Sequence, residues 1–326
     1  KVKDSPEAAR HVERQIRKLG RVYADPPESF DREIKNFSGK PSAYFSNAHT
    51  CLAARMAWEN LSDESRETML WLARERLIDD CHHPEYYLTH FNAGHNAVTT
   101  HVIAAAICAL VFGSETGHPR TDHLLQLGCD ACEAHLHWGY DAQGTPHEGP
   151  MYSRVTLHWV YLYADLLRRN GGEDLFAALP RLRLVTEPLH RMQFPGFAGL
   201  PAFDDCRSLI EQPSMPCLLL TAREYDRPQD LALWHELRHN GKGDPSAGHC
   251  HELLSIPEML WWDGSLPGKD VRDYKRPTAF IGRGKGVGVF RSSWKNEASC
   301  LVVLGQGRSH NIPDHTHADA GHFSVF

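Results

Sequence analysis

The residues best suited to chemistry lie near the carboxyl end of the chain, in the segment His315-Thr316-His317-Ala318-Asp319. Side chains two positions apart leave an extended strand on the same side, so His315, His317 and Asp319 would share one face. Burying three ionisable groups on one face is costly unless a substrate, a metal ion or a partner charge uses them. Taken alone, the segment fits a functional face and an ordinary polar strand surface about equally well.

A second segment places a tyrosine hydroxyl at the beginning of a predicted helix. It runs from Glu148 through Gly149-Pro150 to Tyr152, so the hydroxyl follows a Gly-Pro break. A tyrosine in such a place can transfer protons as a general acid or base. The same helix also carries Trp159, and a lone tyrosine among such aromatics is more often a packing residue.

Together the two segments resemble motifs of the heparinase II/III-like polysaccharide lyases, in which a tyrosine and a histidine flank the cleaved bond of a uronic-acid polymer. Residues 203–208 are similar to a Gly-Asp-Cys-Arg-type loop of these enzymes, and residues 262–267 match the segment before the first strand. The resemblance covers residues from about 90 to 326. The order of the motifs is more specific than any one of them.

The resemblance implies β-elimination next to a uronate. The enzyme removes the proton from the carbon that bears the carboxylate and expels the neighbouring glycosidic oxygen. That proton is not acidic while the carboxylate is charged, so hydrogen-bond donors must stabilise the negative charge that flows into it. One tyrosine can act as both base and acid when the proton and the leaving oxygen lie on the same side.

Each role can be carried over to a residue of this chain. The resemblance makes Tyr152 the acid/base and His315 its partner across the cleft. It places His95 and Asn96 opposite the substrate carboxylate, with Asn92 as a weaker candidate. The chain departs here from the commonest family pattern, in which an asparagine is followed by a bulky residue.

The substrate-binding and metal predictions follow from charge and from the resemblance. A net charge of −6 gives no long-range attraction for a polyanion, so local residues must hold an anionic glycan. Glu148, Arg154 and Arg207 are predicted to bind it. His317 is predicted as a first ligand of a structural zinc ion in the sheet domain, with its other ligands beyond residue 326, or as a structural brace. The absence of a basic stripe disfavours nucleic acid as a partner.

The hydrophobic pattern predicts helices first and strands afterwards. Helical periodicity dominates from about residue 45 to 240, and short β-branched runs bounded by turns begin at about 278. With the resemblance, this predicts an (α/α) toroid of helical hairpins over residues 1–240. A connector follows over 241–277, and an antiparallel β-sandwich begins at 278–326. The expected helices span residues 46–60, 62–79, 97–113, 121–138, 152–170, 173–192 and 228–240.

Composition limits the cellular environments in which the protein can function. The longest apolar run, residues 102–112, is too short to cross a bilayer. Nine cysteines without repeated spacing favour a reducing compartment, whereas the resemblance favours a periplasmic or secreted bacterial protein. The chain begins with Lys1 and ends at Phe326 inside a predicted strand, so we expect further sequence at both ends.

Other motifs suggest rival functions. His235-Glu236-Leu237-Arg238-His239 matches the H-E-x-x-H pattern of zinc peptidases on a plausible helix, although no third ligand follows. A third alternative is a glycan-binding protein that keeps the fold without catalysis.

Three further clusters are predicted to carry no chemistry of their own. Cys129 and Cys132 with His135 resemble a metal spacing but lack a second pair, and fit buried residues of a helix better. The loop at 249–251 is expected to be solvated. Residues 282–286, Gly-Arg-Gly-Lys-Gly, fit a hairpin turn and lack the spacing of a phosphate loop.

Overall fold

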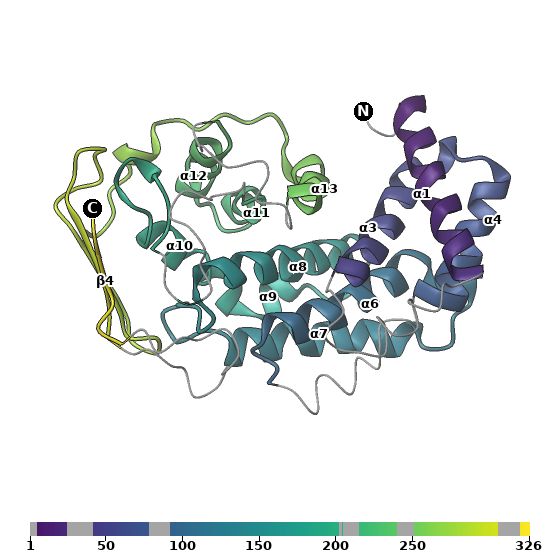
Figure 1. Ribbon diagram of the computed structural model, residues 1–326, viewed down its shortest axis with the longest axis horizontal. Helices are drawn as coiled ribbons and strands as arrows, with labels where there is room; N and C mark the ends of the chain where they lie inside the picture. The colour runs from purple at the N-terminus through teal and green to yellow at the C-terminus, as the bar shows by residue number, and fades with distance from the viewer. Residues whose placement is uncertain are drawn as a thin grey trace. The chain divides into compact units, whose positions relative to one another are not determined.

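The computed structural model describes residues 5–24, 42–77, 92–201, 204, 215–239, 251–305 and 320–326. Helices occupy most of the described residues up to residue 261, and a four-stranded antiparallel sheet follows (Figure 1). This is the predicted order of helical and sheet regions. The described α-helices are α1 (Pro6–Ala24), α3 (Ser42–Ala57), α4 (Asp63–Leu72), α6 (Asn96–Thr116), α7 (Thr121–Trp138), α8 (Gly149–Arg169), α9 (Leu175–Ala178), α10 (Glu187–Arg191), α11 (Cys217–Glu224), α12 (Pro228–His239) and α13 (His251–Trp261).

Most predicted helices are confirmed, and the main exception has a simple cause. The single helix expected over residues 173–192 is wrong, because α9, a 3-10 turn at Pro180–Arg183 and α10 occupy that stretch. Proline lacks an amide proton and is tolerated only at the beginning of a helix, and both the turn and α10 begin around a proline. Helix α13 lies within the stretch predicted as a connector and was not expected.

The contacts divide the chain into two compact units. One comprises residues 1–91, 97–131 and 169–172, and the other comprises residues 92–96, 132–168 and 173–326. In the first unit α1 packs against α3 and α4, and Ser62 caps α4 by accepting a hydrogen bond from the amide of Ser65. The predicted domain boundaries at residues 240 and 277 do not follow this division and stay predictions.

Helix α6 forms the apolar centre of the first unit. It continues past the predicted end at Gly113 to Thr116, and a Cβ at Gly113 would lie 2.4 Å from the hydroxyl oxygen of Thr121. By length and composition α6 could cross a bilayer, but 78% of its apolar window is buried inside the protein. Such burial is typical of a core helix, so α6 itself does not indicate a membrane span.

The sheet belongs to the second unit and has the order β1-β2-β3-β4. All three strand pairs are antiparallel, as predicted. The strands are β1 (Ala279–Gly282), β2 (Val287–Arg291), β3 (Cys300–Leu304) and β4 (Phe323–Val325). Val287, Val289 and Val302 point to the buried face, where successive side chains alternate with those of the outer face.

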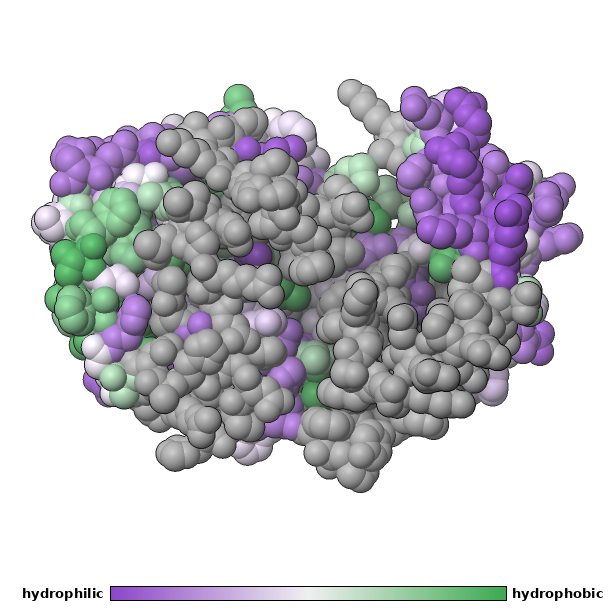
Figure 2. All heavy atoms as spheres, viewed as in Figure 1, coloured by the Kyte–Doolittle hydropathy of each residue, from purple (hydrophilic) through white to green (hydrophobic). Residues whose placement is uncertain are grey.

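The outer face of the sheet is apolar and exposed. The register aligns Phe290 with Leu301 and Leu301 with Val325 in one row across three strands. Val325 is 70% exposed, and Ile281 and Phe323 on the same face are also exposed. Green atoms gather over the sheet in the space-filling view (Figure 2). A contiguous apolar surface of this kind normally has a partner layer.

A partly buried network joins the sheet to the helices of its unit. The indole of Trp294 lies between the guanidinium groups of Arg276 and Arg291, whose carbons are 3.8 and 3.9 Å from the ring centroid. Arg276 also contacts Nδ1 of His190 on α10 at 3.3 Å, and Nε2 of His190 lies 2.7 Å from Asp230 on α12. Burial and the neighbouring arginines lower the pKa of Arg276 to about 10.

Candidate active site

The tyrosine predicted to carry catalysis lies in the first turn of α8. The helix begins at Gly149, whose φ of +80° suits glycine, and Pro150 follows at a position where its missing amide proton costs nothing. Tyr152 is only partly buried, whereas Trp159 and Tyr161 farther along the helix are almost completely buried. The difference in burial separates Tyr152 from the packing aromatics of the same helix.

A short loop before α6 carries the predicted carboxylate-binding residues. The side-chain oxygen of Asn92 accepts a hydrogen bond from the amide of Gly94 at 2.8 Å, and its carbonyl accepts one from the amide of His95 at 2.9 Å. These bonds form a tight turn that is typical of asparagine. Asn92 therefore shapes the loop, His95 remains half-buried, and Asn96 begins the helix.

Glu148 connects this loop to the beginning of α8. Its Oε2 accepts a hydrogen bond from the amide of Asn96 at 2.8 Å, and its Oε1 lies 3.9 Å from Nε2 of His95. The carboxylate is 4% exposed and sits at the positive end of the α6 dipole. Glu148, which lies four residues before Tyr152, thus forms one cluster with His95 and Asn96, more than 50 positions earlier in the sequence.

The buried groups behind the cluster are neutral. The hydroxyl of Tyr140 lies 2.9 Å from the hydroxyl of Ser153 on α8, and burial raises the pKa of Tyr140 well above its ordinary value. His135 on α7 packs its ring edge-on against Tyr140, and its imidazole lies near the backbone of residues 93–94. Burial lowers the pKa of His135 to about 3, so its imidazole is uncharged near neutral pH.

These supporting residues were not identified as part of the site from the sequence. His135 drew attention only through its spacing from two cysteines, and Tyr140 and Ser153 carried no recognisable pattern. Within the described ranges no group of three or more His, Cys, Asp or Glu side chains could hold a metal ion. Cys132 is buried and Cys129 is partly buried on α7, as expected for cysteines on a helix face.

The remaining predicted residues are placed as follows. Arg154 on α8 lies close enough to Cys217 on α11 for its charge to oppose the burial that raises the pKa of this thiol. His315, His317 and Arg207 lie outside the described residues. The pairing of Tyr152 with His315 and the zinc site at His317 therefore stay predictions.

Together with Tyr152, the cluster provides a proton-transfer group and hydrogen-bond donors, two kinds of group that β-elimination requires. A hydroxyl that can transfer a proton stands at one helix start, and an imidazole and an amide stand at the other. Both helix starts present backbone amides with positive dipole ends, which stabilise negative charge. Glu148 holds the second helix start in place through its hydrogen bond to the amide of Asn96.

Glu148→Ala is expected to destabilise the protein by about 1–3 kcal/mol, because it leaves the buried amide of Asn96 without its acceptor. Glu148→Gln is the matched control, since its amide oxygen can still accept that hydrogen bond. Thermal unfolding followed by circular dichroism measures both. Equal melting temperatures for Glu148→Ala and the parent would show that the carboxylate does not cap α6.

The glutamate of the H-E-x-x-H motif at residues 235–239 forms an ion pair with an arginine. Glu236 on α12 is buried and receives two hydrogen bonds from the guanidinium of Arg272, at 2.6 and 3.2 Å. A glutamate held in this way cannot easily serve as a general base for a metal-bound water. His235 lies beside it on the helix, and the described residues provide no metal cluster there.

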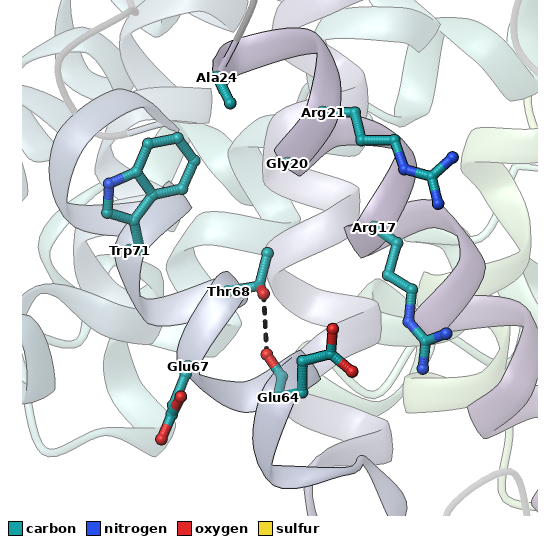
Figure 3. Close-up of a pocket in the computed structure, with 8 residues that line it drawn as sticks. All are labelled: Arg17, Gly20, Arg21, Ala24, Glu64, Glu67, Thr68 and Trp71. Atoms are coloured by element: carbon teal, nitrogen blue, oxygen red, sulfur yellow. Dashed lines mark hydrogen bonds between the residues drawn. The ribbon is translucent and has the colours of Figure 1, made fainter.

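A pocket of about 560 Å³ lies in the first unit between α1 and α4 (Figure 3). Arg17 and Arg21 line one side of it, and Trp71 lines another and is 39% exposed. Its charged lining is mixed, because Glu64 and Glu67 also contribute. None of the predicted site residues that the structure describes lines this pocket.

The fold is similar to that of known lyases. Solved structures that match the chain include heparan sulfate lyase HepC from Pedobacter heparinus, with a TM-score of 0.53 and 13% identity over 97% of this chain and 43% of that one. A structure of heparinase III gives a TM-score of 0.60 and 12% identity over 97% and 45% of the two chains. A heparinase III with methylated lysines gives 0.54 and 16% over 94% and 42%.

These matches establish a similarity of fold. The chain spans less than half the length of each of these structures. No family model matches the sequence, and no curated protein matches it either. The similarity therefore rests on the arrangement of helices and strands over nearly the whole of this chain.

Proposed function

We propose that this protein is a polysaccharide lyase that cleaves a uronate-containing glycan, glycosaminoglycan-like before alginate-like, by β-elimination. The observation that carries the proposal is the fold similarity to heparan sulfate lyases over 94–97% of the chain. The cluster of His95, Asn96 and Glu148 just before Tyr152 supports it, because it combines a proton-transfer group with hydrogen-bond donors for a carboxylate.

In the proposed reaction the phenolate of Tyr152 takes the proton from the carbon that bears the uronate carboxylate. The electron pair of the broken C–H bond forms a carbon–carbon double bond, and the bond to the glycosidic oxygen breaks. The leaving oxygen receives a proton from the Tyr152 hydroxyl or from His315. His95 and Asn96 donate hydrogen bonds to the carboxylate while negative charge builds on it.

The proposal also includes the substrate-binding residues, the arrangement of the helices and of the sheet, and the zinc site. Arg154 and Arg207 are proposed to bind the anionic groups of the substrate, with Asn92 and Glu148 holding the loop that faces it. The helices are proposed to form an (α/α) toroid. The apolar outer face of the sheet supports a β-sandwich, because a second sheet would bury Phe290, Leu301 and Phe323. A structural zinc ion bound by His317 also remains a proposal.

An absorbance screen tests the function. Elimination creates an unsaturated uronate that absorbs in the ultraviolet, so the purified protein is incubated with heparan sulfate, chondroitin sulfate, hyaluronan and alginate. We expect absorbance to rise with at least one of the sulfated glycosaminoglycans. No increase with any of the four, while the protein still binds one of them, would favour a glycan-binding protein without catalysis.

His235→Ala is expected to leave the rate of elimination within about twofold of the parent. The reason is that Glu236 beside it accepts hydrogen bonds from Arg272 and is not available as a general base. The measurement is the initial rate of absorbance increase, together with the melting temperature and the zinc content. Loss of bound zinc and of activity at an unchanged melting temperature would instead support a metal-dependent enzyme.

A further inference from the structure

The turn between β1 and β2 buries a lysine. Hairpin turns normally lie at the surface, and lysine is almost never fully buried unless it is paired. Yet the side chain of Lys285 has no exposed area, whereas Arg283 two residues earlier is exposed. The turn is therefore directed into the protein.

The ammonium of Lys285 has three oxygen neighbours. It donates to the carbonyl of His147 at 3.0 Å and to Oδ1 of Asp204 at 3.0 Å, and it lies 2.8 Å from Oδ2 of the same carboxylate. The Asp204 side chain is equally buried. Two of the three donors of the ammonium make hydrogen bonds here, and the adjacent carboxylate compensates the buried charge.

The backbone of the turn contacts the same loop as the lysine. The amide of Gly284 donates to Oδ2 of Asp141 at 2.9 Å. A Cβ at Gly284 would lie 2.4 Å from Cβ of Asp141, and one at Gly282 would lie 2.3 Å from the hydroxyl oxygen of Thr145. Only glycine permits this approach, so the glycines serve close packing between the turn and residues 141–147.

The two partners of Lys285 lie on either side of Glu148. His147 precedes it directly. Asp204 packs on Gly149, which follows it, because a Cβ at Gly149 would lie 2.9 Å from Oδ2 of Asp204. A displacement of Lys285 would therefore shift Glu148, which hydrogen-bonds the amide of Asn96. It would also shift the first turn of α8, which carries Tyr152.

We propose that Lys285 is a positioning residue of the active site, which couples the first hairpin of the sheet to the loop that holds Glu148. The inference rests on the proposed lyase function. Lys285 touches no reacting atom and acts through His147 and Asp204. It fixes the distance between the loop before α6 and the first turn of α8, on which alignment of the donors with Tyr152 depends.

The first test compares Lys285→Met with Arg283→Met by amide hydrogen exchange. Both variants remove one positive charge from the same turn, but only the first removes a buried contact. We expect faster exchange at the amide of Asn96 and in residues 139–148 for Lys285→Met alone. Identical exchange in the two variants would overturn the proposal. This readout does not depend on activity, so it remains informative if no lyase activity is found.

The second test is kinetic. In Lys285→Met, kcat on the best substrate of the absorbance screen is expected to fall at least about tenfold with KM within about threefold, because alignment is lost and substrate contacts remain. Arg283→Met is expected to keep both constants within about twofold. A folded Lys285→Met protein with the kcat of Arg283→Met would overturn the proposal. Absence of elimination in the parent protein would count against the lyase function instead.

A double variant guards against a failure to fold. Lys285→Met alone leaves the Asp204 carboxylate buried without its partner, which is strongly destabilising. Lys285→Met with Asp204→Asn removes both charges and nearly preserves volume, so it is expected to fold. It should show the same faster exchange at Asn96 and the same loss of kcat. A folded double variant with the exchange and kcat of the parent would overturn the proposal.

Discussion

Tyr152→Phe is expected to lower kcat by about 10²- to 10⁴-fold, the usual contribution of a general acid–base group, with little change in folding or substrate binding. The substitution removes one oxygen from a partly buried side chain in the first turn of α8 and leaves the packing volume unchanged. Initial rates of absorbance increase at several substrate concentrations give kcat and KM separately.

Tyr161→Phe is the matched control for this experiment. Tyr161 lies on the same helix, is fully buried, and donates a hydrogen bond to the carbonyl of Leu182. Its loss is expected to destabilise the protein by about 1 kcal/mol and to leave kcat within about twofold. If Tyr152→Phe lowers kcat less than about tenfold, Tyr152 is not the proton-transfer group.

Asp230→Ala is expected to reduce the free energy of unfolding by about 3–5 kcal/mol, the cost of breaking a buried ion pair by removing one partner. The Asp230 carboxylate lies 2.7 Å from Nε2 of His190, 2.6 Å from the hydroxyl of Thr221 and 3.2 Å from the guanidinium of Arg227. All of these groups are buried, so the substitution leaves several polar atoms without a partner. Urea unfolding measured by tryptophan fluorescence gives the difference.

Glu133→Ala serves as the control for Asp230→Ala. Glu133 is an exposed acid on α7 in the same unit, and its removal is expected to change the free energy of unfolding by less than about 0.5 kcal/mol. A comparable, small effect of Asp230→Ala would mean that this network does not stabilise the contact between α10, α11 and α12.

The sequence was sufficient where the decisive interactions are local. The change from a helical to an alternating period predicted helices followed by an antiparallel sheet, because side-chain periodicity follows directly from backbone geometry. The cap of α4 is an interaction of this local kind, since Ser62 lies only three positions from the amide whose hydrogen bond it accepts. The start of a helix just before Tyr152 could also be predicted from Gly149 and Pro150.

The contacts that assemble the candidate site could not be derived from the sequence. Glu148 meets Asn96 across 52 positions, and Lys285 meets Asp204 across 81 and His147 across 138. No local period encodes such distances, which depend on how helices and strands pack. The sequence alone determined which residue types were available and where helices and strands would begin. Only the tertiary structure decided that the lysine of a glycine-rich turn would be buried beneath the loop of Glu148, because burial depends on what surrounds a residue in space.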